Sequence, residues 1–162
     1  MEVLYHLRPH NGRRNIQRLH DRQQFDKIKE VEGLVLAEPR DYLADLSSGY
    51  ECWAYIFDRS HGRKIGIDST DALKAEVLTR PYTDPRPGAI AAYVGDVYAP
   101  WRGRLWRVPM HVGNVVEVKK GEITIRSKFG FCDVFEHPIN IVPRMYGKYV
   151  KFVYIEGLFS GF

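Results

Sequence analysis

The chain has 162 residues, enough for one domain of ordinary size with a core of its own. A hydrophobic share of 44% and a charged share of 27% exclude a disordered chain, and the net charge of +4 falls short of the excess typical of dedicated nucleic-acid binders. Two cysteines are too few for a disulfide framework or an all-cysteine zinc site. Six histidines leave a mixed site open, but we expect no metal and no cofactor.

No stretch approaches the roughly 20 apolar residues that cross a bilayer, so we expect no membrane span. The first residues lack a basic region followed by an apolar one, so we expect no secretory signal and synthesis in the cytoplasm. Export would then need another route, such as a phage particle or an injection system.

Residues 1–40 are predicted to form an irregular N-terminal extension followed by a helical region. Apolar positions 16, 19, 25 and 28 have the i, i+3 spacing of one helix or two short ones between Arg13 and Val31. The arginines of this segment could hold phosphate, but the pattern favours a solvated helix face. They are Arg13, Arg14, Arg18 and Arg22.

Residues 41–156 are predicted to form the core. Ser48 and Glu51 have the Ser-x-x-Glu spacing of a helix start, which places Cys52 in the first turn of a helix. A second helix is predicted from Asp68 to Arg80, followed by a proline-rich loop.

Strands are predicted after Gly88, at residues 89–94, 110–118, 122–127, 138–142 and 148–155. The Lys-Lys-Gly sequence at 119–121 predicts a hairpin turn, and residues 100–109 a loop rich in Pro, Trp and Arg. Helices followed by antiparallel strands are typical of an α+β fold. The apolar tail, residues 157–162, is expected to pack on the chain's own body, a second copy or another protein.

Cys52 is the strongest candidate for chemistry. A cysteine attacks as thiolate, and a helix N-terminus lowers the pKa of a thiol because its free N–H groups favour negative charge. A base is also needed, and His111, at the start of a predicted strand, could face the helix start. Either residue by itself is more often structural than catalytic.

Three segments carry a family resemblance: Tyr-Glu-Cys-Trp at 50–53, Arg-Pro-Gly-Ala at 86–89 and His-Val-Gly at 111–113. In this order, within residues 45–128, they resemble the NlpC/P60 branch of the papain-like cysteine hydrolases. The resemblance implies an α+β, papain-like core with N-terminal helices packed on an antiparallel β-sheet. It also implies Cys52 as nucleophile, His111 as base and Ser127 as the neutral residue that orients the histidine.

By the same resemblance, the expected function is a cysteine peptidase or amidase that cleaves a peptide crosslink of bacterial cell wall (peptidoglycan). We expect Tyr50, Trp53, Trp101 and Trp106 to contact the substrate. His137 is expected to be structural, with a second site histidine as the alternative.

Two departures favour an alternative function. Ala89 stands where the family has an acid, and Ser127 carries no charge. These departures, with the apolar tail, favour a catalytically inactive papain-like module for binding or assembly, such as a virion component. A nucleic-acid binder that uses residues 13–22 and the Trp/Arg loop is the least favoured alternative.

Overall fold

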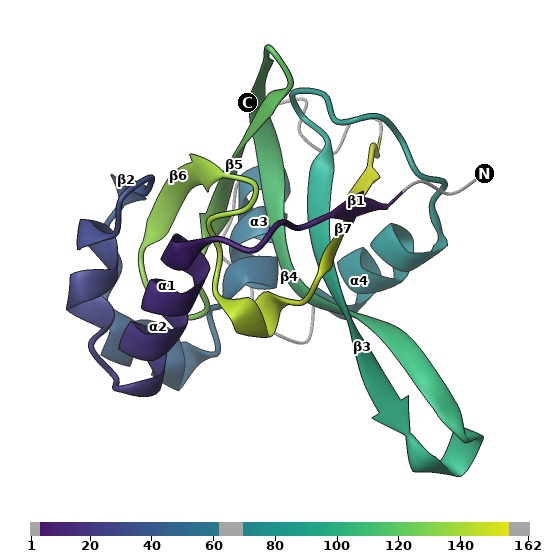
Figure 1. Ribbon diagram of the computed structural model, residues 1–162, viewed down its shortest axis with the longest axis horizontal. Helices are drawn as coiled ribbons and strands as arrows, with labels where there is room; N and C mark the ends of the chain where they lie inside the picture. Colours follow the sequence, from purple (N-terminus) through teal and green to yellow (C-terminus); the bar gives the residue numbers. More distant parts are fainter. Residues whose placement is uncertain (1–3, 62–69, 156–162) are drawn as a thin grey trace.

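The computed structural model describes residues 4–61 and 70–155 of the chain. The fold is α+β, with a seven-stranded sheet in which all neighbours are antiparallel and with helices on both of its faces (Figure 1). The strand order is β1-β7-β3-β4-β5-β6-β2. Within the described residues, no helix is long and apolar enough to span a bilayer.

The strands are β1 (Tyr5–His6), β2 (Val35–Glu38), β3 (Ile90–Ala99), β4 (Arg104–Lys119), β5 (Glu122–Lys128), β6 (Val134–Pro138) and β7 (Tyr149–Val153). The α-helices are α1 (Asn11–Asp21), α2 (Tyr42–Ser48), α3 (Cys52–His61) and α4 (Thr70–Thr79). Short 3-10 helices are η1 (Phe25–Glu30), η3 (Pro100–Arg102) and η4 (Arg144–Tyr146).

The two faces of the sheet bury two separate core clusters. Ala91 and Tyr93 of β3 belong to the cluster that includes Ile16 of α1; we call this side the α1 face. Ala92 and Val112 belong to the cluster that includes Trp53 of α3; we call this side the α3 face. The alternation follows from the pleat, which points successive side chains to opposite sides of a sheet.

Several local predictions are confirmed. The region between Arg13 and Val31 holds two short helices, α1 and η1. The hairpin turn between β4 and β5 has positive φ at both Lys120 (52°) and Gly121 (79°), the geometry that matches the twist of paired strands. A cap that the sequence did not predict begins α1, since the ring Nδ1 of His10 accepts a hydrogen bond from the main-chain N–H of Gly12 at 2.9 Å.

Other local predictions differ from the structure. Ser48 does not begin a helix; it ends α2, because Gly49 takes a left-handed conformation (φ 70°) and stops that helix. Residues 138–142 are not a strand, since β6 ends at Pro138. Residues 1–40 are not only an irregular N-terminal extension and helices, because β1 and β2 form the two edges of the sheet. The apolar tail lies outside the described residues.

The hairpin of β3 and β4 continues beyond the rest of the sheet. β7 pairs with β3 only as far as Val94, and β5 pairs with β4 only from Asn114. Residues 95–109 therefore form a two-stranded projection, which we call the arm (Figure 1). The sequence predicted a loop over 100–109, whereas the structure extends β3 and β4 to a short turn at η3.

Candidate catalytic residues and the polar network

Cys52 is the first residue of α3, as the sequence predicts, but its thiol is sealed inside the protein. The residue is 3% exposed and packs in the core cluster of the α3 face with Ala92 and Val112. Its Sγ donates to Oε2 of Glu51 at 3.7 Å. A substrate carbonyl therefore has no open path to the sulfur.

The surroundings of Cys52 oppose a thiolate. Burial raises the pKa of Cys52 well above its ordinary value, and the adjacent Glu51 carboxylate raises it further. Main-chain N–H groups of Val112 and Trp53 act in the opposite direction, but their effect is smaller. The thiol is therefore neutral at physiological pH.

His111 is fully buried on the other side of the sheet. Its register partner on β3 is Tyr93, so both side chains point to the α1 face. The imidazole stacks on the Tyr146 ring, with centroids 4.0 Å apart and planes 8° from parallel. Neither ring nitrogen has a hydrogen-bond partner among the described residues.

Burial, and then the nearby His137, lower the pKa of His111 well below its ordinary value, so the ring is neutral. Cys52 packs on the α3 face beside Val112, while the ring of the preceding residue points the opposite way. The structure therefore does not join the predicted nucleophile and base. A one-residue change of position along a strand moves a side chain to the other face, and residue spacing alone does not fix that choice.

Ser127 orients a histidine, but the histidine is His137 rather than His111. The Oγ of Ser127 lies 2.7 Å from Nε2 of His137, and Nδ1 of that ring lies 2.8 Å from the carbonyl oxygen of Pro138. A carbonyl oxygen can only accept, so Nδ1 carries the proton and Ser127 donates to Nε2. Burial lowers the pKa of His137 to about 4, which keeps the pair neutral.

The four aromatic residues predicted to contact substrate do not form one surface. Tyr50 and Trp53 are buried in the core cluster of the α3 face, where no substrate reaches them. Trp101 is 83% exposed at the tip of the arm. Trp106 belongs to the arm segment of β4, and its side chain lies outside the described part of the structure.

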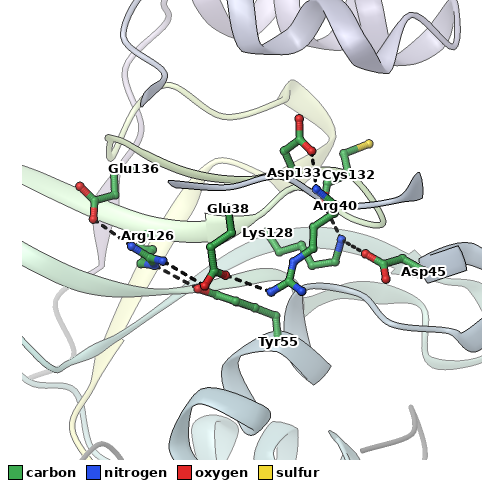
Figure 2. A network of polar contacts seen from close by, with 9 residues as sticks. All are labelled: Glu38, Arg40, Asp45, Tyr55, Arg126, Lys128, Cys132, Asp133 and Glu136. Atoms are coloured by element: carbon green, nitrogen blue, oxygen red, sulfur yellow. Dashed lines mark hydrogen bonds and ion pairs between the residues drawn. The ribbon is translucent and has the colours of Figure 1, made fainter. Parts of the chain in front are cut away.

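A partly buried polar network on the α3 face was not predicted (Figure 2). Nζ of Lys128 lies 2.8 Å from Oδ2 of Asp45, and both side chains are almost fully buried. Nearby, Arg126 contacts Glu38 at 3.4 Å and Glu136 at 3.3 Å. These ion pairs tie β2 and α2 to β5 and β6, so their role is to hold elements together.

The sequence contained one signal for this network. Ser127 and Lys128 are adjacent on β5, and alternation sends them to opposite faces, the serine to His137 and the lysine to Asp45. A lysine whose side chain is buried needs a partner, but Asp45 lies far away in the chain and no local pattern indicates it.

The described residues hold no group of three or more His, Cys, Asp or Glu side chains that could bind a metal ion. Comparison of the chain with models of known protein families, with curated proteins and with solved structures gives no match.

Proposed function

We propose that this chain is a catalytically inactive α+β module that binds a protein partner with an acidic surface through its arm. The observation that carries the proposal is the arm itself, a hairpin that leaves the sheet and presents exposed aromatic side chains. Trp101 is 83% exposed and Tyr98 59% exposed. Large aromatic side chains are the residue type that most often dominates binding at protein interfaces.

The arm gains little from the rest of the fold. A two-stranded hairpin without a third strand is marginally stable, and exposed tryptophan adds no burial. Such a segment is consistent with a contact that is completed by another molecule.

The charge of the arm favours an acidic partner. Residues 95–109 contain Arg102, Arg104 and Arg107 and only one acid, Asp96. The chain as a whole has 24 basic and 20 acidic residues, a smaller excess than nucleic-acid binders usually carry, so we favour a protein surface over a nucleic acid.

The sealed thiol and the separation of Cys52 from His111 support an inactive module over a hydrolase. A papain-like core remains part of the proposal. It is supported by the three sequence segments and by the packing of α3, which begins with Cys52, against β4 and β5 of an antiparallel sheet.

The first experiment tests inactivity. Iodoacetamide labelling at pH 7, followed by peptide mapping, should modify Cys52 at least about 100-fold more slowly than a cysteine in a short peptide, because a buried neutral thiol is inert. In 6 M guanidinium chloride the two rates should be equal. Rapid labelling confined to Cys52 in the folded protein would contradict the proposal and favour the thiol hydrolase.

The second experiment tests the arm. Fluorescence anisotropy with labelled poly-L-glutamate should show salt-sensitive binding that Trp101→Ala weakens several-fold. Leu43→Ala is the matched control, because Leu43 is 73% exposed on α2 and lies outside the arm. Tighter binding of an oligothymidylate of equal charge would contradict a protein partner and point to nucleic acid.

A further inference from the structure

A pocket of about 480 Å³ lies where the start of α1 meets the segment that connects η4 to β7. Among the described residues, its lining includes six basic side chains and no Asp or Glu. We call it the basic pocket, and its basic residues are His6, His10, Arg13, Arg14, Arg144 and Lys148. The arm and the predicted catalytic residues take no part in it.

Arg13 is the fixed point of the basic pocket. It is only 8% exposed, and its Nε donates to the carbonyl oxygen of Val142 at 3.2 Å. One terminal nitrogen, Nη2, donates to the carbonyl oxygens of Gly147 at 2.7 Å and Pro143 at 3.4 Å. The other, Nη1, has no hydrogen-bond partner in the described part of the chain. The guanidinium is thus held in place with two N–H donors unused.

The glycine that accepts from Arg13 is required by the backbone. Gly147 has φ of 99°, and a Cβ there would collide with the carbonyl group of Val94. Only glycine allows the η4–β7 connection to run this close to β3 and to present its carbonyl to the guanidinium.

Within the described part of the chain, the arginines and the lysine of the basic pocket have no carboxylate partner. None of Arg13, Arg14, Arg144 and Lys148 forms an ion pair with a described residue. Burial lowers the pKa of Arg13, the hydroxyl of Tyr93 opposes this change, and the Arg144 charge lowers the pKa further. Arg13 and Arg144 are therefore close enough to repel one another, and no described carboxylate forms an ion pair with either of them.

The start of α1 adds to the positive potential. Its first turn carries no acidic residue and instead contains Arg13 and Arg14. A helix N-terminus favours negative charge, so two arginines there destabilise the helix unless an anion lies beside them. A merely solvated helix face would not bury one of these arginines or turn it toward main-chain carbonyls.

We propose that the basic pocket binds a small molecule that carries phosphate groups. Several cations around a concave site suit a ligand with two or more negative charges, and a fixed guanidinium fork matches the oxygens of a phosphate. A volume of about 480 Å³ is within the range of pockets that hold small ligands. A polymer backbone needs an open track rather than a pocket.

The test is isothermal titration calorimetry of the full chain with pyrophosphate in 0.15 M NaCl. We expect a single site with a dissociation constant below about 0.1 mM. Arg14→Gln and Arg144→Gln remove exposed pocket cations whose side chains form no ion pair with a described residue, and each should weaken binding about tenfold or more. Circular dichroism should show both variants folded.

Arg18→Gln is the matched control, because Arg18 is exposed on the same helix but does not line the pocket. It should change the pyrophosphate affinity less than twofold. Equal weakening by Arg18→Gln would show a diffuse charge effect and overturn the site. If pyrophosphate gives no more heat of binding than an equal concentration of sulfate, the assignment to phosphate is overturned.

Further titrations distinguish the source of the phosphate. Inorganic phosphate that binds as tightly as pyrophosphate assigns a single-phosphate ligand, and a nucleotide that binds more tightly assigns a ligand with an organic part; both support the proposal. A single-stranded oligonucleotide that binds more tightly than all of these, and that Trp101→Ala weakens, would overturn it. That result would make the pocket one end of a nucleic-acid surface shared with the arm.

Discussion

The polar network on the α3 face and the basic pocket on the α1 face hold their charged side chains in opposite ways. On the α3 face each cation of the network has a carboxylate nearby: Lys128 has Asp45, and Arg126 and Arg40 share Glu38 (Figure 2). On the α1 face the described hydrogen-bond partners of the Arg13 side chain are all main-chain carbonyls. The comparison separates charges whose partners lie within the protein from charges that can take a partner from outside.

The largest expected effect comes from removing the counterion of Lys128 on the α3 face. Asp45→Ala should lower the free energy of unfolding by about 3–5 kcal/mol, because it leaves the Lys128 ammonium buried without a counterion. Urea denaturation measures the change. Asp45→Leu combined with Lys128→Met should recover most of it, since the pair can be replaced by apolar contacts. Asp26→Ala, an exposed acid, is the control and should change stability by less than about 0.5 kcal/mol. A loss below about 1 kcal/mol for Asp45→Ala would mean that the pairing is unimportant.

Lowering the pH should destabilise the protein through His137 on the α1 face. The pKa of His137 is about 4 in the folded protein and about 6.5 when unfolded, so between these values the unfolded chain binds more protons. Stability from this group is complete above about pH 6.5 and is lost as the pH falls toward 4, by about 3 kcal/mol in total. His137→Gln should flatten the dependence of unfolding free energy on pH in this window. An unchanged slope in the variant would contradict a neutral buried His137.

His111→Phe should test whether this histidine is structural or chemical. Its two ring nitrogens have no hydrogen-bond partner among the described residues, so their burial costs desolvation free energy that no hydrogen bond offsets. A phenyl ring can stack on Tyr146 in its place, and the thermal midpoint should stay within a few degrees or rise. A loss of more than about 2 kcal/mol would show that the imidazole makes a polar contact that matters.

The smallest effects should differ in sign between the faces. Arg14→Gln should raise stability by about 0.3–0.5 kcal/mol at low salt, because it removes an unfavourable positive charge from the N-terminal end of α1. The gain should shrink in 1 M NaCl. Arg40→Gln should lower stability by about 1 kcal/mol, since it removes the contact with Glu38 at 3.0 Å. If urea denaturation shows that both variants change the free energy of unfolding in the same direction, the contrast between the two faces is wrong.

Sequence patterns that act locally predicted much of the fold. The helix that begins at Cys52, the Lys-Lys-Gly turn and strands β5 and β7 were predicted because each depends on neighbouring residues, whereas the prediction missed β6. The edge strands were not, because β1 has two residues and β2 four, too short for any alternation to register.

The candidate site was less predictable because it depends on which way side chains point. The sequence placed Cys52 at a helix start, which is observed, and His111 at the start of a strand, whereas His111 lies in the middle of β4. It could not show that the two residues face opposite sides of the sheet. The register of β3 and β4 shifts between Tyr93 and Val94, and no residue pattern indicated that irregularity. The basic pocket also joins Arg13 to Arg144, which no local signal links.

The positions of β1 and β2 have a consequence for how the chain is made. β1 pairs with β7, and β2 with β6, so both edges of the sheet come from the first part of the chain and wait for its last strands. A ribosome delivers residues 5–38 long before residues 134–153 leave its exit tunnel. Throughout that interval the early strands have no native neighbour. The nascent polypeptide therefore cannot finish its sheet stepwise, and it depends on late closure, or on a chaperone, to protect its first strands during translation.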